Sequence, residues 1–590
     1  MGIKTKKNVG AIVLRNGVSF RVWAPFASQV SVIGSFNNWI ETPLESENDG
    51  YWSATLRDAR AGQEYKFVIH NGDQVFIRND PRALHFTTSA GNSVIARSGF
   101  DWGEDDFTPP PLDQQVIYEL HVGTFNRPEA SINGTFADLI DKLDYLAELG
   151  INMIELMPVS SMLMDRGWGY AIDYIFSVES LYGGRHGFMQ FVKTAHDRGI
   201  GVILDVVYNH FGPDENLDLW DFDGWHEDGK GGIYFYNDWR AETPWGNTRP
   251  DFGRPEVRQY ILDNIKMWMH DCRVDGLRVD STAYIRNVLG ANDDPEHDLP
   301  EGWLLLQQIN SIAHKINPQV ITIAEDIAYN DYLTKPIKDG GAGFNSQWEL
   351  NFPFALRDAL KSNNPDAINM DNICAQLTKN FNGDPLQRII FADSHDSAAN
   401  GNSRLVEVIS PGNPDSLFAR QQTLIAATLL LSTPGIPMLF QGQELMQGGT
   451  FNDWEGVDWS RAAKHQGIVS AFTHLIALKK NAYGVSLGLS GNNINILSVD
   501  QNNKVLVYHR WKNGGPKDDT IVVVNFSSAS FKDYRLSMPR DGLWKVRFNS
   551  TWSGYSGDFK NVSVDIAEAK NSKTTIVLPP ACGLIFSQDD

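Results

Sequence analysis

The chain has 590 residues, and its contents of 42% hydrophobic and 21% charged residues are typical of a globular protein. It carries 51 Lys and Arg residues against 72 Asp and Glu residues, which gives a formal net charge of −21. This balance argues against general binding to nucleic acids or anionic membranes, because both need a basic protein surface. We therefore expect no nucleic-acid or membrane partner.

Cysteine usage and apolar segments indicate a protein of a reduced, aqueous compartment. Cys272, Cys374 and Cys582 are widely spaced and predict neither a disulfide framework nor a zinc site. The N-terminal residues lack the pattern of a signal peptide. The most apolar stretch, 424–440, contains two prolines and a glycine, so it predicts a buried helix, turn and strand rather than a membrane span. We expect a cytoplasmic protein.

The first hundred residues predict a β-sandwich, because short strand candidates alternate with turn residues and there is no helical periodicity. The predicted strands are 18–23, 29–34, 51–56 and 64–69. Trp23 and Trp39 lie in this region and could either bind glucan or pack in the protein; of the two readings, we expect core packing for both. A proline-rich linker, 106–112, follows, so we place the first domain at 1–108.

Beyond the linker, strand and helix patterns alternate over 113–485. This alternation is typical of a closed (β/α)₈ TIM barrel or a doubly wound sheet. The predicted strands are 116–121, 151–156, 201–207, 276–279, 320–324, 388–392 and 437–441, and the predicted helices include 136–149, 187–198, 255–271 and 303–316. We therefore expect a catalytic barrel here.

One long segment of this region, 211–254, is aperiodic and rich in Gly, Asp and Trp. An irregular segment of this length inside a compact domain is usually functional, so we interpret it as an insertion in the barrel. We expect no cofactor; a structural Ca²⁺ in the insertion stays open.

From residue 486 onward the helical pattern stops and strands return. They are predicted at 494–499, 505–511, 520–525, 574–578 and 582–587. We therefore place a C-terminal β-domain at 486–590. The predicted fold class is multidomain α/β, with a barrel flanked by an N-terminal β-sandwich and a C-terminal β-domain.

Polar side chains gather directly after four of the predicted barrel strands. They are Asp205, Asn209 and His210, then Arg278 and Asp280, then Glu325 and Asp326, and then His395 and Asp396. Because the C-terminal strand ends of a (β/α)₈ barrel form the rim that carries the active site, we expect these clusters to meet in one pocket.

A rim with several carboxylates, an arginine and two histidines suits glycoside hydrolysis, which needs one carboxylate nucleophile and one carboxylic acid. Arg278 stands two positions before Asp280, so both point to the same face of a strand. This spacing makes Asp280 the better nucleophile and Glu325 the better acid, with Asp396 as a third carboxylate that binds sugar hydroxyls. Strand-end carboxylates can also cap helices or hold Mg²⁺. No phosphate-binding loop, GxGxxG or HExxH pattern is present.

Four of these segments resemble the signature regions of the α-amylase superfamily of glycoside hydrolases, in the order of that family. They are DVVYNH (205–210), GLRVD (276–280), IAED (323–326) and SHD (394–396). YELHVGTF (118–125), WGYAIDYIF (168–176) and TPGIPMLFQGQE (433–444) are similar to other barrel segments of the family. Segment 20–39 resembles the glycogen-binding β-sandwich of branching enzymes, isoamylases and maltooligosyltrehalose trehalohydrolases.

The resemblance implies a retaining mechanism with a covalent glycosyl intermediate on Asp280. Glu325 would protonate the leaving oxygen and then activate the acceptor, while Asp396 would stabilise the distorted sugar. The resemblance also implies roles for four further residues. Arg278 would orient Asp280, His210 and His395 would bind sugar hydroxyls, and Tyr170 would be the stacking platform. Trp245, in TPWGN (243–247), is a candidate for sugar contact or for plain loop packing.

The motifs resemble two subfamilies. SHD followed by Ala399, Asn400 and Gly401 is similar to branching enzymes, which usually carry Glu where this chain has Ser397. The segments 205–214 and TPWGN are more similar to the trehalohydrolases, which usually have Asn-His-Asp-Gln in the fourth region.

Hydrolysis and branching proceed through the same glycosyl-enzyme intermediate. Water resolves it in a hydrolase, and a glucan 6-hydroxyl resolves it in a branching enzyme. We predict 1,4-α-glucan branching on amylose, glycogen or maltooligosaccharides. The alternatives are a maltooligosyltrehalose trehalohydrolase or another α-1,4-glucan hydrolase. A non-catalytic glucan-binding protein and a metal-dependent barrel enzyme are the outside readings. The oligomeric state is not predicted.

Overall fold

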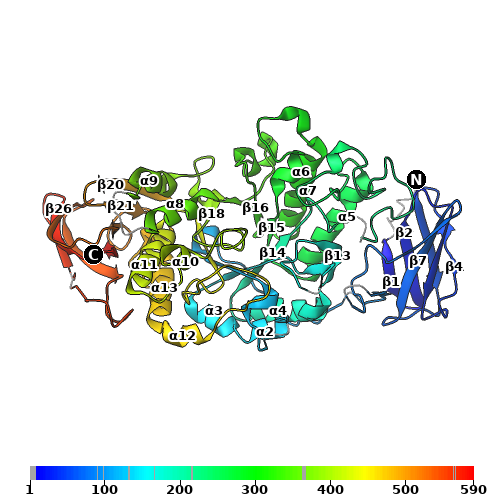
Figure 1. Cartoon of the computed structure of the whole chain (residues 1–590), viewed down its shortest axis with the longest axis horizontal. Helices are drawn as coiled ribbons and strands as arrows, with labels where there is room; N and C mark the ends of the chain where they lie inside the picture. The colour runs from blue at the N-terminus through cyan, green and yellow to red at the C-terminus, as the bar shows by residue number, and fades with distance from the viewer. Residues whose placement is uncertain are drawn as a thin grey trace.

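The computed structural model describes residues 8–88, 91–97, 99–129, 133–164, 166–213, 217–361, 367–562, 564 and 566–589. Residues 1–7 of the predicted first domain, 214–216 of the predicted insertion and the C-terminal Asp590 thus lie outside the described residues. Figure 1 shows an elongated chain with an N-terminal β-domain at one end, a barrel in the middle and a C-terminal β-domain at the other end.

The N-terminal domain is a sandwich of two antiparallel sheets, as predicted. The first sheet has the order β1 (Gly10–Leu14), β2 (Gly17–Trp23), β6 (Tyr51–Leu56) and β5 (Glu45–Ser46). The second has the order β4 (Thr42–Pro43), β3 (Gln29–Gly34), β7 (Glu64–Asn71) and β8 (Gln74–Arg78), with β9 (Ser93–Val94) on β7. Inward-facing residues such as Phe20 and Phe67 are fully buried and form the core between the sheets.

The two tryptophans of this domain differ. Trp23, at the end of β2, is buried as predicted. The prediction for Trp39 was wrong, because its side chain is 41% exposed. Trp39 lies in the turn after β3 with a φ of 59°, and its N–H donates to the carbonyl of Gly34. A turn residue is not held by the alternation of a strand, so the ring points away from the core.

Eight parallel strands close the central barrel, which decides between the closed barrel and the doubly wound sheet. The order is β10 (Ile117–Leu120), β11 (Met153–Leu156), β14 (Gly201–Val206), β15 (Gly276–Val279), β16 (Ile321–Ala324), β17 (Ser346–Trp348), β18 (Arg388–Phe391) and β19 (Ile436–Phe440). β19 pairs with β10 to complete the ring. The sequence analysis did not predict β17, which has only three residues, two of them polar.

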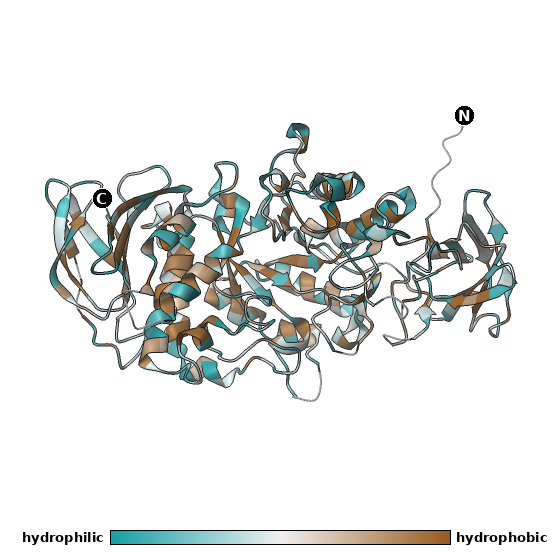
Figure 2. Cartoon of the chain, turned by 45° about the horizontal axis from the view of Figure 1, so that its top comes forward, coloured by the Kyte–Doolittle hydropathy of each residue, from teal (hydrophilic) through white to brown (hydrophobic). Residues whose placement is uncertain are grey.

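Helices cover the outside of the barrel. The longer ones are α4 (Gly184–His196), α5 (Pro255–Lys266), α7 (Pro300–Ile316), α8 (Asn351–Leu360), α9 (Met370–Thr378), α11 (Leu417–Ser432) and α13 (Gln466–Lys479). The domain also has the shorter helices α1 (Val122–Phe125), α6 (Thr282–Arg286), α10 (Leu405–Ile409) and α12 (Ser460–Lys464), of which α6 carries the cleft residue Tyr284. Figure 2 shows that hydrophobic residues concentrate on the barrel strands and on the helices around them.

Two predicted helices differ from the structure. The predicted helix 136–149 is two helices, α2 (Phe136–Ile140) and α3 (Leu143–Leu149). The predicted helix 255–271 is α5 followed by a π-helical segment, Met267–Asp271. The apolar stretch 424–440 is the end of α11, a turn and β19, as predicted. Among the described residues, no helix has both the length and the apolarity needed to cross a membrane.

Irregular structure dominates the predicted insertion. Within its described residues, 211–213 and 217–254, the longest regular element is the short 3₁₀ helix Trp239–Ala241. A separate hairpin of β12 (Ser160–Met162) and β13 (Ile172–Val178) lies between β11 and α4.

The C-terminal domain is a six-stranded sheet with a two-stranded sheet beside it. The strand order of the larger sheet is β20 (Asn493–Asp500), β21 (Val505–Trp511), β22 (Thr520–Asn525), β27 (Cys582–Ser587), β24 (Gly542–Asn549) and β25 (Ile566–Ala569). The smaller sheet consists of β23 (Phe531–Ser537) and β26 (Lys573–Leu578). The sequence analysis missed β23, β24 and β25. These strands expose much of their length, so their apolar pattern is weak.

Candidate active site

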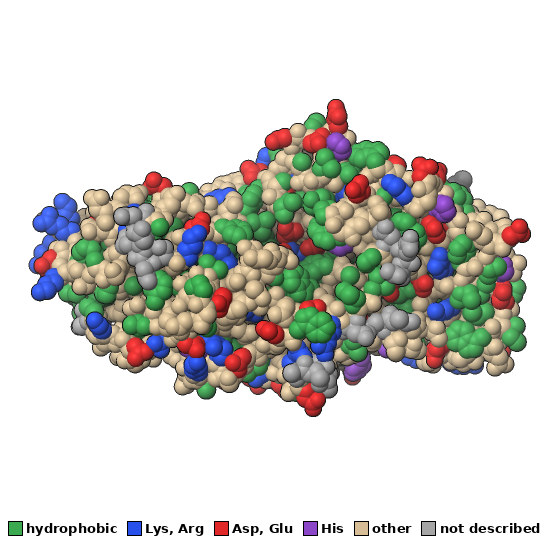
Figure 3. All heavy atoms as spheres, in the orientation of Figure 1, with side chains coloured by type: hydrophobic (Ala, Val, Ile, Leu, Met, Phe, Trp, Pro, Cys, Tyr) green, Lys and Arg blue, Asp and Glu red, His purple; other side chains and the backbone are tan. Residues whose placement is uncertain are grey.

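A cleft of about 690 Å³ opens at the C-terminal ends of the barrel strands. Figure 3 shows a hollow in the middle of this face, where acidic side chains lie among hydrophobic ones. The cleft is lined by seven of the eight site residues predicted from the sequence, namely Tyr170, His210, Trp245, Asp280, Glu325, His395 and Asp396. The eighth, Arg278, is fully buried behind Asp280. The structure thus brings the four strand-end clusters together.

Arg278 is the buried cation of this site. It lies on β15, and its Nη1 atom is 2.6 Å from Oδ1 of Asp280 and 2.7 Å from Oδ2 of Asp205. Its Nη2 atom is 3.8 Å from Oε2 of Glu325. The ring of Trp348 lies 4.4 Å from the guanidinium carbon. A buried guanidinium with several carboxylates around it both neutralises part of their charge and fixes their orientation.

Asp280 is held on both of its carboxylate oxygens. Arg278 binds Oδ1, and the Asn209 side-chain amide donates to Oδ2 at 2.6 Å and to the Asp280 carbonyl at 2.9 Å. Asn209 also contacts the neighbouring His210 ring through Nδ1 of the histidine. Burial lowers the pKa of His210 to about 4, so this imidazole is neutral near pH 7. Asn209 therefore connects the strand-end residues of β14 to Asp280.

Glu325 follows β16 and is buried beside Asp280. Its Oε2 atom accepts a hydrogen bond from the backbone N–H of Ser281 at 2.8 Å. Ser281 has a φ of 44°, in the left-handed region that costs energy for a residue with a Cβ atom. Burial raises the pKa of Glu325 to about 8; the Arg278 charge opposes this shift, and the Asp280 charge adds to it. Glu325 is therefore a neutral carboxylic acid at pH 7, able to donate a proton.

His395 and Asp396 follow β18 and form an ion pair. Nε2 of His395 lies 3.3 Å from Oδ2 of Asp396, and Nδ1 of the same ring binds the Glu119 carboxylate of β10. Burial disfavours a charged imidazole, yet Asp396 and Glu119 together raise the pKa of His395 well above its ordinary value. Burial would raise the pKa of Asp396, but the His395 charge outweighs it and lowers that pKa to about 2. Asp396 also accepts a hydrogen bond from Asn400 at 3.2 Å.

Tyr170 connects the two halves of the site. Its hydroxyl donates to Oδ2 of Asp205 at 2.6 Å and lies 2.9 Å from Nε2 of His395. Its ring stacks on the His395 imidazole with the ring centroids 5.2 Å apart. Burial raises the pKa of Asp205 to about 6. Tyr170 therefore has a hydrogen-bonding function in addition to the aromatic face predicted from the sequence.

Trp245 lies at the edge of the cleft. Its ring stacks on the His210 imidazole, with centroids 4.6 Å apart and planes 16° from parallel, and 46% of the side chain is exposed. It also meets the ring of Tyr284 edge to face at 5.3 Å. An aromatic ring that is partly packed and partly open fits both of the predicted readings, loop packing and sugar contact.

The sequence analysis assigned no site function to Glu119, Glu155, Trp168 or Tyr284. Trp168 and Tyr284 line the cleft, and Glu119 holds His395. Glu155 lies beside Glu119 in the register of β10 and β11, and burial raises its pKa well above the ordinary value. For Glu119 and Glu155 the sequence did contain a signal, namely a carboxylate inside an apolar strand. A buried acid needs a partner or a proton.

Among the residues that the structure describes, no group of three or more His, Cys, Asp or Glu side chains is arranged to hold a metal ion.

Three family models match the chain. The model for the alpha amylase catalytic domain matches residues 119–218 and 213–476. The model for carbohydrate-binding module 48, the isoamylase N-terminal domain, matches 8–83. The model for the alpha amylase C-terminal all-beta domain matches 496–589.

Curated relatives match this chain over most of their length. The 1,4-alpha-glucan branching enzyme GlgB of Bacillus caldolyticus is 30% identical over 574 residues, which cover 93% of this chain and 83% of the relative. The enzyme of the same name from Mycobacterium tuberculosis is 30% identical over 610 residues, with 96% and 80% covered. That of Oceanobacillus iheyensis is 29% identical over 573 residues, with 92% and 87% covered.

Solved structures share the fold at lower identity. A pullulanase type I from Bacillus subtilis complexed with maltose has a TM-score of 0.78 at 20% identity, covering 99% of this chain and 86% of that one. A putative alpha amylase from Salmonella typhimurium has a TM-score of 0.75 at 22% identity, covering 99% and 100%. These structures support the arrangement of a barrel between two β-domains.

Proposed function

Because the chain belongs to the alpha-amylase family of enzymes, whose catalytic-domain model matches more than half of it, we propose that it is a 1,4-α-glucan branching enzyme. Its substrate is an α-glucan such as amylose or glycogen. The observation that carries the chemistry is the pairing of Asp280 with the neutral acid Glu325 around one buried guanidinium, that of Arg278. The relatives named as branching enzymes, which match along nearly the whole chain, support the choice of reaction.

In the first step, the Asp280 carboxylate attacks the anomeric carbon of the sugar at the scissile bond. The α-1,4 bond breaks, and Glu325 gives its proton to the departing O4 atom. The result is a glycosyl ester on Asp280 and an ionised Glu325. In the second step, Glu325 takes the proton of an acceptor 6-hydroxyl, whose oxygen attacks the same carbon and displaces Asp280. An α-1,6 linkage forms with the original anomeric configuration.

The remaining site residues bind and orient the sugar. Asp396 and the charged His395 bind hydroxyl groups from one side, and neutral His210 binds them from the other. The aromatic rings of Tyr170 and Trp245 offer apolar faces on which a pyranose ring packs. A cleft of about 690 Å³ has the size of a small-molecule site and accommodates part of a glucan chain.

The test is incubation of the purified protein with amylose, followed by iodine colour, reducing ends and NMR of the linkages. A branching enzyme lowers the iodine colour with few new reducing ends and forms α-1,6 linkages. Reducing ends that rise in step with the colour loss would replace branching by hydrolysis. If amylose is unchanged, release of trehalose from maltooligosyltrehalose would identify a trehalohydrolase. Asp280→Asn is the control, because it removes the nucleophile in all three reactions.

A further inference from the structure

The described part of the insertion from residue 217 to residue 254, here called the insertion loop, contacts the N-terminal sandwich at one end and the cleft at the other. It has almost no regular structure of its own. Fixing an irregular backbone costs conformational entropy, so contacts from other parts of the chain must hold such a loop in one shape. The N-terminal sandwich supplies many of these contacts.

Arg78 provides the most specific of them. This residue ends β8, and its guanidinium donates hydrogen bonds to three consecutive backbone carbonyls of the insertion loop. The acceptors are Trp220, Asp221 and Phe222, at 3.0, 3.1 and 3.4 Å. A guanidinium presents its donors on three nitrogens in fixed directions, whereas an ammonium group has its three donors on one nitrogen at the end of a flexible stem. Arg78 thus fixes the path of the loop backbone rather than one side chain.

Two further residues of the sandwich, Phe26 and Asn71, also bind the insertion loop. The backbone N–H of Phe26 donates to Oδ2 of Asp223 at 2.9 Å, and the Asn71 amide donates to the Asp223 carbonyl at 3.1 Å. The Phe26 ring stacks on Trp225 with centroids 4.5 Å apart and planes 10° from parallel.

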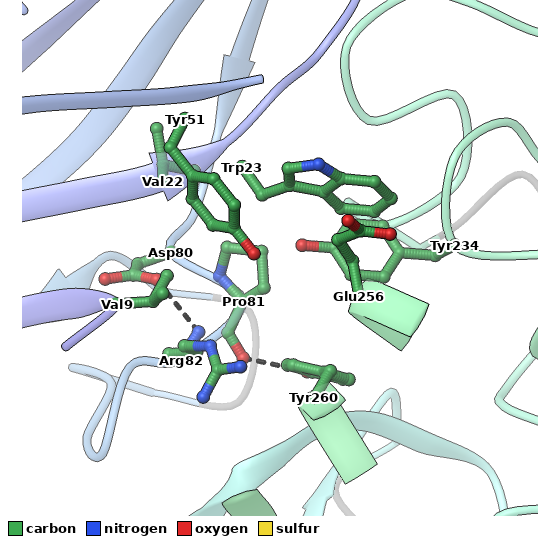
Figure 4. Close-up of a pocket in the computed structure, with 10 residues that line it drawn as sticks. All are labelled: Val9, Val22, Trp23, Tyr51, Asp80, Pro81, Arg82, Tyr234, Glu256 and Tyr260. Atoms are coloured by element: carbon green, nitrogen blue, oxygen red, sulfur yellow. Dashed lines mark hydrogen bonds between the residues drawn. The ribbon is translucent and has the colours of Figure 1, made fainter. Parts of the chain in front are cut away.

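The interface beside these contacts is closely packed. Figure 4 shows Trp23 and Tyr51 of the sandwich facing Tyr234 of the insertion loop and Tyr260 of α5. The Trp23 and Tyr234 rings meet edge to face at 5.6 Å, and the Tyr260 hydroxyl donates to the Pro81 carbonyl at 2.8 Å. The cavity left between them measures about 20 Å³, room for about one water molecule. The sandwich and the loop therefore form one packed unit.

Contacts inside the insertion loop connect this unit to the cleft. Phe222 packs edge to face on Tyr234 at 5.6 Å, and two residues further on the N–H of Tyr236 donates to the Arg249 carbonyl at 3.2 Å. The buried Arg249 side chain then donates to the carbonyls of Arg240 and Glu242 at 2.6 and 2.7 Å.

The turn that follows carries the cleft residue. The N–H of Thr243 donates to the Gly246 carbonyl at 2.8 Å, which closes a tight turn around Trp245. This turn is the part of the loop that places Trp245 against His210.

We propose that the N-terminal sandwich positions the wall of the cleft, and that Arg78 is a positioning residue that acts through the insertion loop on Trp245. The proposal depends on the proposed function in one respect, since Trp245 is taken to contact the glucan. It assigns the sandwich a function within the catalytic reaction that does not require the sandwich itself to bind sugar.

The first test compares Arg78→Ala with Arg82→Ala by hydrogen–deuterium exchange of the full chain. Arg82 lines the same interface (Figure 4), but it pairs with Asp263 of α5 at 3.0 Å and packs on Tyr260, so it controls for a general weakening of the contact between the sandwich and the barrel. We expect faster exchange of residues 236–247 in Arg78→Ala and unchanged exchange there in Arg82→Ala. Unchanged exchange in Arg78→Ala, or an equal increase in both variants, would overturn the proposal.

The second test is kinetic. Arg78→Ala should raise KM for amylose about threefold to tenfold with kcat unchanged, because a shift of the aromatic ring weakens binding by about 1 kcal/mol. Trp245→Ala should raise KM to the same value as Arg78→Ala. The double variant should raise KM no further, as expected for two residues that act as one unit. Additive effects would count against the coupling. If Arg78→Ala does not fold, Phe26→Ala, which removes the ring stack on Trp225, is tested in the same two ways.

The two tests separate this inference from the proposed function. Hydrogen exchange needs no turnover, so it tests the positioning of the loop even in a protein that does not branch glucans. If the protein hydrolyses amylose instead, KM is measured from reducing ends, and the same expectation holds.

Discussion

Nη1 of Arg278 lies 2.6 Å from Oδ1 of Asp280 and 2.7 Å from Oδ2 of Asp205, so one nitrogen atom binds two carboxylates. The contact with Asp280 lies within one strand end, whereas the contact with Asp205 joins β15 to the neighbouring strand β14. Since Asp205 remains as a counter-charge, an isosteric change at Asp280 leaves Arg278 paired. The nucleophile can therefore be removed while the fold is kept.

Asp280→Asn should reduce glucan turnover by at least about 10⁴-fold, the scale seen when one member of a covalent catalytic unit is removed. The amide cannot form the glycosyl ester. Initial rates on amylose measure the loss, and thermal unfolding checks that the variant is folded. Glycogen binding should persist. A folded Asp280→Asn protein with substantial turnover would assign the nucleophile to another residue.

The reaction should slow as the pH rises through about 8. Burial raises the pKa of Glu325 to about 8, and only its neutral form can protonate the leaving oxygen. The profile of kcat/KM against pH for maltooligosaccharides should therefore have an alkaline limb near this value. An α-maltosyl fluoride, whose leaving group needs no proton, should lose this limb in the glycosylation step. An identical limb with both substrates would exclude Glu325 as its source.

Glu325→Gln should stabilise the folded protein at alkaline pH while it impairs catalysis. The pKa of Glu325 is raised in the folded state, so its neutral form contributes stability that is present at low pH and lost as the pH rises through about 8. Glutamine stays neutral throughout. The gain in the free energy of unfolding should thus be largest at pH 9 and smallest near pH 5. Denaturant unfolding at these two pH values measures it, and a gain that is larger at pH 5 would contradict the assigned protonation state.

Tyr170→Phe separates the hydrogen-bonding function of Tyr170 from its aromatic face. The change removes the bonds to Asp205 and His395 but keeps the ring. Asp205 keeps its bond from Arg278 and His395 keeps its ion pair with Asp396, so the loss of two buried hydrogen bonds should lower the free energy of unfolding by about 1–3 kcal/mol. KM for maltooligosaccharides should change little, because the apolar face remains. Tyr170→Ala, which removes both functions, should raise KM as well; equal KM values for the two variants would argue against a stacking function.

The sequence predicted most strands of the barrel because buried parallel strands are short, apolar and β-branched, as in Gly201–Val206. It missed β17, whose three residues carry a serine and a glutamine, and it joined α2 and α3 into one helix. It also placed Trp39 in the core, where the structure has an exposed turn residue. These differences have one cause, namely that length and periodicity are weak signals for very short elements and for turns.

The sequence by itself determined the alternation of strands and helices, the resemblance to the family and seven of the residues that line the cleft, because each depends on local order. In a (β/α)₈ barrel, a carboxylate that directly follows a strand lies at the rim of the active site. Only the tertiary structure decided which groups share a proton or a charge. The links from Glu119 to His395 and from Tyr170 to Asp205 join residues that are far apart in the sequence. The raised pKa of Glu325 and the hydrogen bonds from Arg78 to the insertion loop likewise depend on segments that are distant in the sequence and pack together in the fold.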